Sequence, residues 1–158
     1  MFALIIGIDK YQHIFKLSGA VADADAMESF FQNDVGVPSN RVMNLRDASA
    51  TRENILKAFQ ALRNDDSLCI RRDDPIVIYF AGHGTLIPGS NGGQGAKIQA
   101  ICPQDVEMED KSDRTIFPIP DYLLASLINQ LSRKRGNNIV GHFVDTIRLH
   151  EFDMGWRV

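Results

Sequence analysis

The sequence has little of what marks a secreted or membrane protein. Only two of its 158 residues are cysteines, Cys69 and Cys102, too few for a disulfide framework or a metal-ligand cluster. Few cysteines are typical of a reducing setting, so we expect a cytoplasmic protein. The apolar run from Phe2 to Ile8 is too short to span a membrane and lacks the basic flank and cleavage site of a signal peptide.

An excess of positive charge is also absent. Lys and Arg number 17 and Asp and Glu 20, for a net charge of −3, which argues against a nucleic-acid or anionic-membrane partner. We expect the one basic cluster, 133–135, to decorate the C-terminal end of a helix. The phosphate-binding loop and the G-x-S-x-G elbow of serine hydrolases are missing too. Without repeats or a Pro/Ser-rich linker, the chain is expected to form one fold.

Apolar strand patterns alternate with helical periodicity along the chain. Strands are predicted at 2–8, 42–45, 76–80, 97–102 and 139–144. One helix is predicted from Val21 to Asn33, one after an N-cap at Thr51, and one between Pro120 and Gly136. This alternation favours an α/β fold with a parallel sheet and helices on both of its faces.

One histidine stands where the central strand ends. The apolar run at 76–80 is followed by Ala81-Gly82-His83-Gly84, and the two glycines allow a sharp turn and a close backbone approach. Ligands bind at the carboxyl edge of open α/β sheets, so His83 is placed to act as a general base or acid. The alternative is a turn residue that ends the strand and does no chemistry.

Two loops could add to such a site. Residues 88–95 hold four glycines and are interpreted either as a lid over the site or as a plain surface connection. An acidic stretch follows, with carboxylates at Asp105, Glu107, Glu109, Asp110 and Asp113. We expect a solvated loop there; its oxygens could bind calcium, although EF-hand spacing is absent.

An ordered series of segments resembles the caspase-type cysteine peptidases, and within them the metacaspase branch. It comprises Ile5-Ile6-Gly7-Ile8 with Tyr11, Leu17 to Ala24, Ala50-Thr51, Asp74 with Tyr79 to Gly84, Pro103-x-Asp105, and Asp121 with Leu124, Leu127 and Leu131. The series covers about residues 1–138. It implies a three-layer α/β/α fold with a mainly parallel sheet, and a cysteine-type endopeptidase active in proteolysis.

The resemblance also implies roles for single residues. His83 would be the dyad histidine, and the Gly84 N–H would donate to the oxyanion. Asp23 would line the S1 pocket as a buried carboxylate that selects Arg or Lys, so the expected partners are peptides with a basic P1 residue. Asp23 could instead be an ordinary first-turn helix carboxylate. No cofactor is expected, although family resemblance makes calcium activation an option.

The resemblance breaks where the nucleophile should stand. In the family, the strand that corresponds to 139–144 ends in Asp-Cys-Cys-His-Ser-Gly. This chain has Asp145, Thr146 and Ile147 there instead. Cys69 and Cys102 lie elsewhere, and both are expected to be small buried hydrophobes. We therefore predict a partial caspase-like domain at 1–140, truncated after its fourth core strand, and a divergent tail at 141–158. A truncated, inactive form of a peptidase is the expected state of this chain.

Three functions remain open at this point. The first is the metacaspase-like endopeptidase, truncated here. The second is a non-catalytic pseudo-peptidase that binds peptides or proteins in the same cleft. The third is an unrelated α/β ligand-binding domain in which Gly82-His83-Gly84 is coincidental. Nothing in the sequence indicates the oligomeric state.

Overall fold

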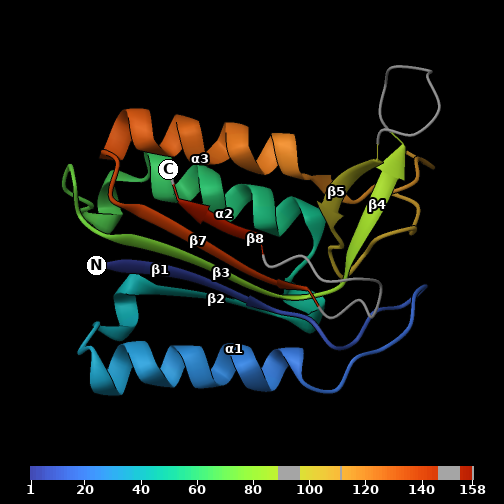
Figure 1. The fold of residues 1–158 in the computed structure, drawn as a ribbon, viewed down its shortest axis with the longest axis horizontal. Coiled ribbons are helices and arrows are strands. Elements are labelled where there is room, and N and C mark those ends of the chain that lie inside the picture. The colour runs from blue at the N-terminus through green and yellow to red at the C-terminus, as the bar shows by residue number, and fades with distance from the viewer. Residues whose placement is uncertain (89–96, 111, 146–153, 158) are drawn as a thin grey trace.

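A five-stranded sheet forms the centre of the protein (Figure 1). The computed structural model describes residues 1–88, 97–110, 112–145 and 154–157. The strand order is β2 (Val42–Arg46), β1 (Phe2–Gly7), β3 (Ile76–Gly82), β7 (Ile139–Asp145) and β8 (Met154–Arg157). The first four strands are parallel, as the alternating pattern predicted.

Helices cover both faces of this sheet, which gives the predicted three layers. In Figure 1, α1 (Ala20–Ser29) lies on one face, and α2 (Arg52–Asn64) and α3 (Asp121–Arg135) lie on the other. A π-helical turn at Phe30–Asp34 extends α1, so the predicted end near Asn33 is confirmed. No helix within the described ranges is long and apolar enough to cross a membrane.

The central strand, β3, is apolar at every position because both of its faces are buried. Successive side chains of a strand point to opposite faces of the sheet. Ile78 and Phe80 belong to the core under α2 and α3, whereas Tyr79 and Ala81 belong to the core under α1. Because both faces of β3 are covered, the strand has no polar alternation, as is usual for a parallel sheet.

Close packing of α1 on β1 depends on one glycine. A Cβ built on Gly7 would lie 2.6 Å from the Cβ of Ala24 and 2.9 Å from the carbonyl oxygen of Ala20. Any side chain there would push the helix away from the sheet. Small residues at these three positions therefore set how closely the α1 layer approaches the strand that leads to the site.

Side chains cap α2 in the way that its sequence predicted. The Thr51 hydroxyl accepts a hydrogen bond from the Asn54 amide at 3.2 Å. The Arg52 amide donates to the Asp105 carboxylate at 2.8 Å, so the first acid of the 105–113 stretch is part of the fold. The solvated-loop prediction holds for the exposed Glu107, and it is wrong for Asp105.

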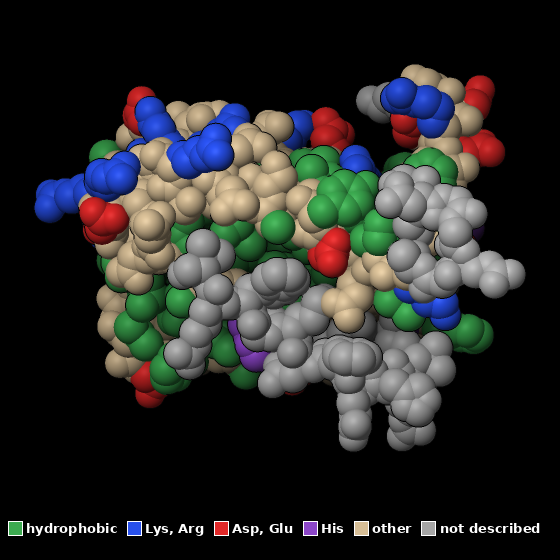
Figure 2. All heavy atoms as spheres, turned by 45° about the horizontal axis from the view of Figure 1, so that its top comes forward, with side chains coloured by type: hydrophobic (Ala, Val, Ile, Leu, Met, Phe, Trp, Pro, Cys, Tyr) green, Lys and Arg blue, Asp and Glu red, His purple; other side chains and the backbone are tan. Residues whose placement is uncertain are grey.

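The basic cluster at the end of α3 is only partly a surface feature. Arg133 and Lys134 are exposed, and Figure 2 shows basic side chains gathered toward this end of the face. Arg135 is 7% exposed and donates to the carbonyl oxygens of Leu62 at 3.0 Å and Ile70 at 2.9 Å. The expectation of a decorated helix end is therefore wrong for Arg135, whose guanidinium satisfies buried carbonyls.

A smaller antiparallel sheet follows the central strand. Its order is β4 (Gly84–Pro88), β5 (Lys97–Ile101) and β6 (Ile119–Pro120). The predicted strand at 97–102 is thus confirmed. The glycine-rich loop at 88–95, interpreted either as a lid or as a surface connection, lies outside the described residues beyond Pro88.

The parallel part of the main sheet ends with its fourth strand, but the sheet itself continues. β8 pairs antiparallel with β7, in a register that sets Val140 opposite Arg157 and Phe143 opposite Met154. Residues 154–157, which belong to the predicted divergent tail, therefore pair with the main sheet. β7 also runs across residue 140, where the sequence predicted a boundary between domain and tail.

Candidate active site

The candidate site lies at the carboxyl ends of the parallel strands. Asp9 follows β1, and His83 follows β3 directly. Asp145 is the last residue of β7, in register with Gly82 of β3. Parallel strands deliver their following residues to one sheet edge, so these three positions share the edge where such folds bind ligands.

The imidazole of His83 is held by a backbone carbonyl. Its Nε2 lies 2.7 Å from the carbonyl oxygen of Phe15, and the ring is half-buried. A carbonyl oxygen can only accept, so Nε2 carries the proton. In the neutral ring Nδ1 is then the basic nitrogen, free of the proton and able to receive one.

The buried Tyr11 fixes the backbone of His83 and of Cys102, which lies next to it in the fold. The His83 amide donates to the Tyr11 hydroxyl at 2.8 Å, and that hydroxyl donates to the Cys102 carbonyl at 3.3 Å. The two rings of Tyr11 and His83 are 4.9 Å apart. The Cys102 amide donates to the His83 carbonyl at 2.8 Å, which ties the histidine to the segment after β5.

The loop that carries Phe15 is anchored at both ends. The Asp9 carboxylate accepts from the amides of Gly19 at 3.1 Å and Ala20 at 2.9 Å, so it caps the N-terminus of α1. The Leu17 amide donates back to the Asp9 carbonyl at 2.9 Å. The chain between residues 9 and 19 is thereby closed into a loop that holds the Phe15 carbonyl over His83.

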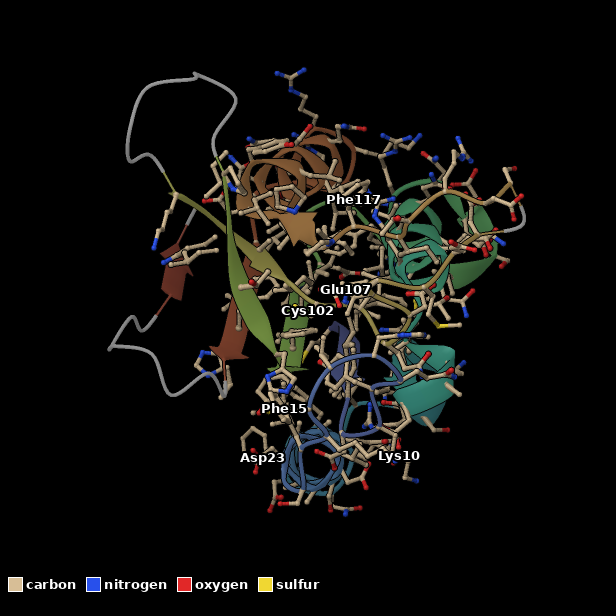
Figure 3. The ribbon with its side chains drawn as sticks, turned by 90° about the vertical axis from the view of Figure 1, so that its right-hand side faces the viewer. Lys10, Phe15, Asp23, Cys102, Glu107 and Phe117 are labelled. Carbon is tan, nitrogen blue, oxygen red and sulfur yellow. The ribbon has the colours of Figure 1, made fainter. Side chains whose placement is uncertain are left out.

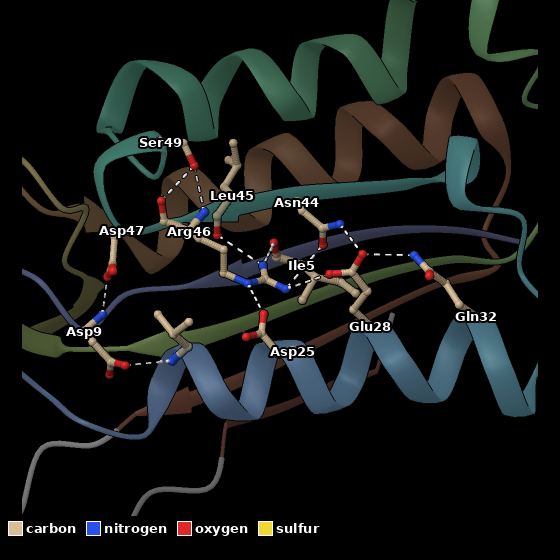
Figure 4. Close-up of polar contacts among 11 residues, drawn as sticks. Ile5, Asp9, Asp25, Glu28, Gln32, Asn44, Leu45, Arg46, Asp47 and Ser49 are labelled. Atoms are coloured by element: carbon tan, nitrogen blue, oxygen red, sulfur yellow. Dashed lines mark hydrogen bonds and ion pairs between the residues drawn. The ribbon is translucent and has the colours of Figure 1, made fainter.

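Asp47 fixes the start of the same loop (Figure 4). Its carboxylate accepts from the amides of Asp9 at 2.8 Å and Lys10 at 2.9 Å. Burial acts to raise the pKa of Asp47, but the hydrogen bonds from Lys10 and Asp9 outweigh it and hold the pKa below its usual value. The carboxylate therefore stays charged, and keeps its hydrogen bonds from the Asp9 and Lys10 amides, at all but acidic pH.

Arg46 ties the end of β2 to α1 beside this loop. Its guanidinium donates to the Ile5 carbonyl at 2.9 Å. It also pairs with the carboxylates of Asp25 at 2.9 Å and Glu28 at 3.3 Å (Figure 4). These contacts are structural, and they hold the elements on one side of the site together.

A cavity of about 770 Å³ opens beside His83. Figure 3 shows Phe15, Cys102, Glu107 and Phe117, which all line it. Its wall is mainly apolar and also includes Ile14, Ile87, Val106, Ile116 and the backbone of Gly84. Such a mixture of apolar wall and few polar groups is typical of a ligand site.

The two cysteines have different surroundings. Cys102 is buried, as predicted, and lies in the wall of the cavity beside His83. Cys69 is exposed, so the expectation of a buried hydrophobe is wrong. It ends a 3₁₀ turn in the left-handed conformation, with φ +53°, before the start of β3. It therefore lies at the amino end of that strand, whereas His83 follows its carboxyl end.

Asp23 lies in the first turn of α1 and is exposed. It is absent from the wall of the cavity that contains His83. Burial of the Tyr79 phenol raises the pKa of Tyr79, and the negative charge of Asp23 raises it further. The expected burial of this carboxylate is thus wrong, and its role in substrate selection stays a prediction.

The described acidic residues do not fit a calcium site. Within these residues, no group of three or more His, Cys, Asp or Glu side chains is arranged to hold a metal ion. Asp105 caps α2, and Asp110 accepts from the Ser112 amide at 2.7 Å within its own turn. Hydrogen bonds from the Ser112 and Arg114 amides lower the pKa of Asp110.

The sequence predicted part of this site. His83 and Gly84 lie at the cavity, as the strand-end argument indicated. Tyr11 was noted only as part of a motif, and Phe15 was missed, because its contribution is a backbone carbonyl. Thr146 and Ile147, at the positions expected for sulfur, lie outside the described residues.

Comparison with known proteins agrees with this geometry. The family model described as "Caspase domain" matches residues 1–141. Metacaspase-3 of Arabidopsis thaliana is 29% identical over 116 residues, which are 69% of this chain and 31% of that protein. Metacaspase-1B of Aspergillus oryzae is 30% identical over 132 residues, 80% of this chain and 27% of that protein.

A solved structure shares the fold. Protein GSU0716 from Geobacter sulfurreducens matches with a TM-score of 0.64 at 17% identity, over 90% of this chain and 48% of that one. The chain belongs to the caspase-domain family of cysteine peptidases and is similar to metacaspases. It spans less than a third of the length of the two metacaspases named above.

Proposed function

We propose that this chain is the histidine-bearing part of a metacaspase-type endopeptidase domain that cleaves after Arg or Lys. The observation that carries the proposal is the orientation of His83 at the sheet edge. With Nε2 donating to the Phe15 carbonyl, Nδ1 is left as the base. Family membership supports peptide or protein substrates.

In such a domain, Nδ1 of His83 takes the proton from a thiol delivered by the end of β7. The thiolate attacks the scissile carbonyl carbon, and the Gly84 N–H donates to the oxyanion that forms. The imidazolium then gives its proton to the leaving amine, and water hydrolyses the thioester. Asp23 attracts the basic side chain before the scissile bond, and its exposure allows a cation to reach it.

We infer that the 158-residue chain does not complete this reaction. No cysteine stands between Gly141 and Val158. Cys69 is at the amino end of β3, and Cys102 is buried in the cavity wall. The change in sequence character near residue 140 is the reason to regard the chain as a truncated form. A cytoplasmic setting and calcium activation stay predictions.

A pseudo-peptidase is the second candidate. It is favoured by one observation: the cavity beside His83 is present although no cysteine follows Asp145 in the sequence. In this reading the protein binds basic peptides without turnover. Incubation of a bound peptide with the Ile147→Cys variant separates the two hypotheses. A peptidase that lacks only its thiol should regain turnover in this variant, whereas a pseudo-peptidase should keep the peptide intact.

The proposed specificity is tested by calorimetry with an eight-residue peptide that carries one central Arg. We expect the chain to bind it about tenfold more tightly than the same peptide with Gln, a ratio in the range of a charge-assisted hydrogen bond. Asp23→Asn should remove the difference, and Asp34→Asn, on the exposed π-helical turn, should not. Equal binding of both peptides to the unaltered chain would contradict the proposal.

A further inference from the structure

We propose that the cavity beside His83 takes a second basic side chain of the substrate, with Glu107 as the carboxylate that receives its charge. The inference rests on the proposed function for the peptide nature of the ligand. It adds a specificity that Asp23 does not provide. The substrates it implies carry two basic residues, one directed to each side of His83.

Glu107 is held in place by its backbone. It adopts a left-handed conformation with φ +65°, which non-glycine residues rarely adopt unless the surrounding structure holds them. Its amide donates to the Ile116 carbonyl at 2.9 Å, and the Ile116 amide donates to the Met108 carbonyl at 2.7 Å. The loop therefore presents Glu107 at the cavity in a fixed backbone position.

The charges around the cavity favour a cation. Glu107 is the only acidic residue in its described wall, and no Lys or Arg lines it. Among the described residues Glu107 forms no ion pair, unlike Asp47 and Asp110, which pair with Lys10 and Arg114. A carboxylate at an apolar cavity without a protein cation is complementary to a positively charged ligand group.

The apolar wall suits the stem of such a side chain. Lys and Arg bury their methylene stems along apolar surface while the charged head stays near water. Ile87, Val106 and Ile116 supply that surface. Phe15 and Phe117 are 91% and 68% exposed, so their rings are accessible to a ligand cation as well as to water.

The carboxylates of Asp23 and Glu107 lie to opposite sides of Phe15 and Cys102 (Figure 3). In Figure 3, Asp23 lies below Phe15, whereas Glu107 and Phe117 lie above Cys102. Phe15 holds the His83 ring and lines the cavity with Glu107, and Asp23 is outside that cavity. An extended peptide that passes His83 can therefore direct one basic side chain to each carboxylate.

Methyl NMR of the isotope-labelled chain tests this inference with two small probes. N-acetyl-arginine N-methylamide carries the cation, and the matching norleucine compound carries only the apolar stem. We expect the arginine probe to shift the methyl signals of Ile87 and Ile116, with an affinity about fivefold higher than that of norleucine, as for a partly exposed ion pair. Glu107→Gln should equalise the two affinities, and Glu109→Gln, at an exposed position outside the cavity wall, should not.

Two outcomes would overturn the inference. Equal affinities in the unaltered chain would assign the cavity to a neutral apolar side chain, and unshifted Ile87 and Ile116 signals would exclude the cavity as the site. These failures are distinct from failure of the proposed function. If Asp23→Asn weakens peptide binding and Glu107→Gln does not, only the second subsite is wrong. If the arginine probe binds at the cavity and Asp23→Asn does not change peptide binding, the Glu107 subsite is correct and the Asp23 subsite is wrong.

Discussion

The Nε2 atom of His83 lies 2.7 Å from the carbonyl oxygen of Phe15, although the two residues are 68 positions apart. The contact joins the loop after β1 to the end of β3, the two neighbouring strands at the centre of the sheet. It sets the tautomer of the imidazole, because a carbonyl oxygen accepts and cannot donate. The ring of the proposed general base is thereby oriented by a backbone group.

Tyr11→Phe tests how firmly the site is built. The change removes the hydroxyl that accepts from the His83 amide and donates to the Cys102 carbonyl, in a side chain that is 1% exposed. We expect a loss of about 1–3 kcal/mol in the free energy of unfolding, the cost of leaving buried partners unsatisfied. Urea denaturation measures it. Tyr122→Phe, at an exposed position, should change stability by less than about 0.5 kcal/mol, and equal effects would refute the assignment.

Gly7→Ala tests the contact between α1 and β1. The added methyl group would lie 2.6 Å from the Cβ of Ala24, well inside van der Waals contact. We expect a destabilisation of about 1–3 kcal/mol from this overpacking, measured by thermal or urea unfolding. Gly19→Ala is the matched control, because a Cβ there meets nothing within 4 Å. If the two variants were equally stable, the close approach would not be essential.

Arg135→Met tests the buried guanidinium. The variant keeps much of the side-chain volume but leaves the carbonyl oxygens of Leu62 and Ile70 without their donor. Because hydrogen bonds from charged groups are strong, we expect a loss of about 3 kcal/mol in unfolding free energy. Arg133→Met is the control. Arg133 is exposed in the same last turn of α3, so the change should leave the free energy of unfolding nearly unaltered. A neutral Arg135→Met would show that these carbonyls are satisfied in another way.

The stability of the protein should fall in acid partly through Asp47. The pKa of Asp47 in the folded protein is below its usual value of 3.8, so the carboxylate binds a proton more readily in the unfolded chain. The stability that it provides is therefore present above about pH 3.8 and lost as the pH falls through the folded-state pKa. Asp47→Asn removes this titration, and Asn tolerates the φ of +42° at this position.

Melting temperatures measured between about pH 2 and pH 5 test this. The curve of Asp47→Asn should be flatter than that of the unaltered chain. The stability of Asp47→Asn should still fall somewhat in acid, because two other carboxyl groups have lowered pKa values. Asp65 accepts hydrogen bonds from the side chain and backbone of Ser67, which lower its pKa, and the pKa of Asp110 is lowered as well. Parallel curves for the two proteins would contradict the role given to Asp47.

The fold was predictable because its core strands and helices have strong local signals. The run at 76–80 is apolar on both faces because α1 covers one side and α2 and α3 cover the other. Thr51 and Gly136 mark helix ends by their own capping chemistry. The strand at 154–157 has no comparable signal, because its pairing with β7 depends on tertiary context.

The site was predictable only in part. His83 could be found because glycines flank it at a strand end. The cavity could not, because its wall is assembled from segments around residues 14, 83, 102 and 116 that only the fold brings together. Arg135 was misjudged because a charged triplet at a helix end looks the same whether its last member is buried or solvated.

The most direct test of His83 as the dyad base supplies the missing thiol. Ile147→Cys is made together with Cys69→Ser, which removes the exposed thiol, and alkylation by iodoacetamide is followed at pH 6. An imidazole partner lowers the pKa of a thiol, so we predict alkylation at least about tenfold faster than in the same protein carrying His83→Ala. Equal rates with and without His83 would contradict the assignment of this histidine to the catalytic dyad.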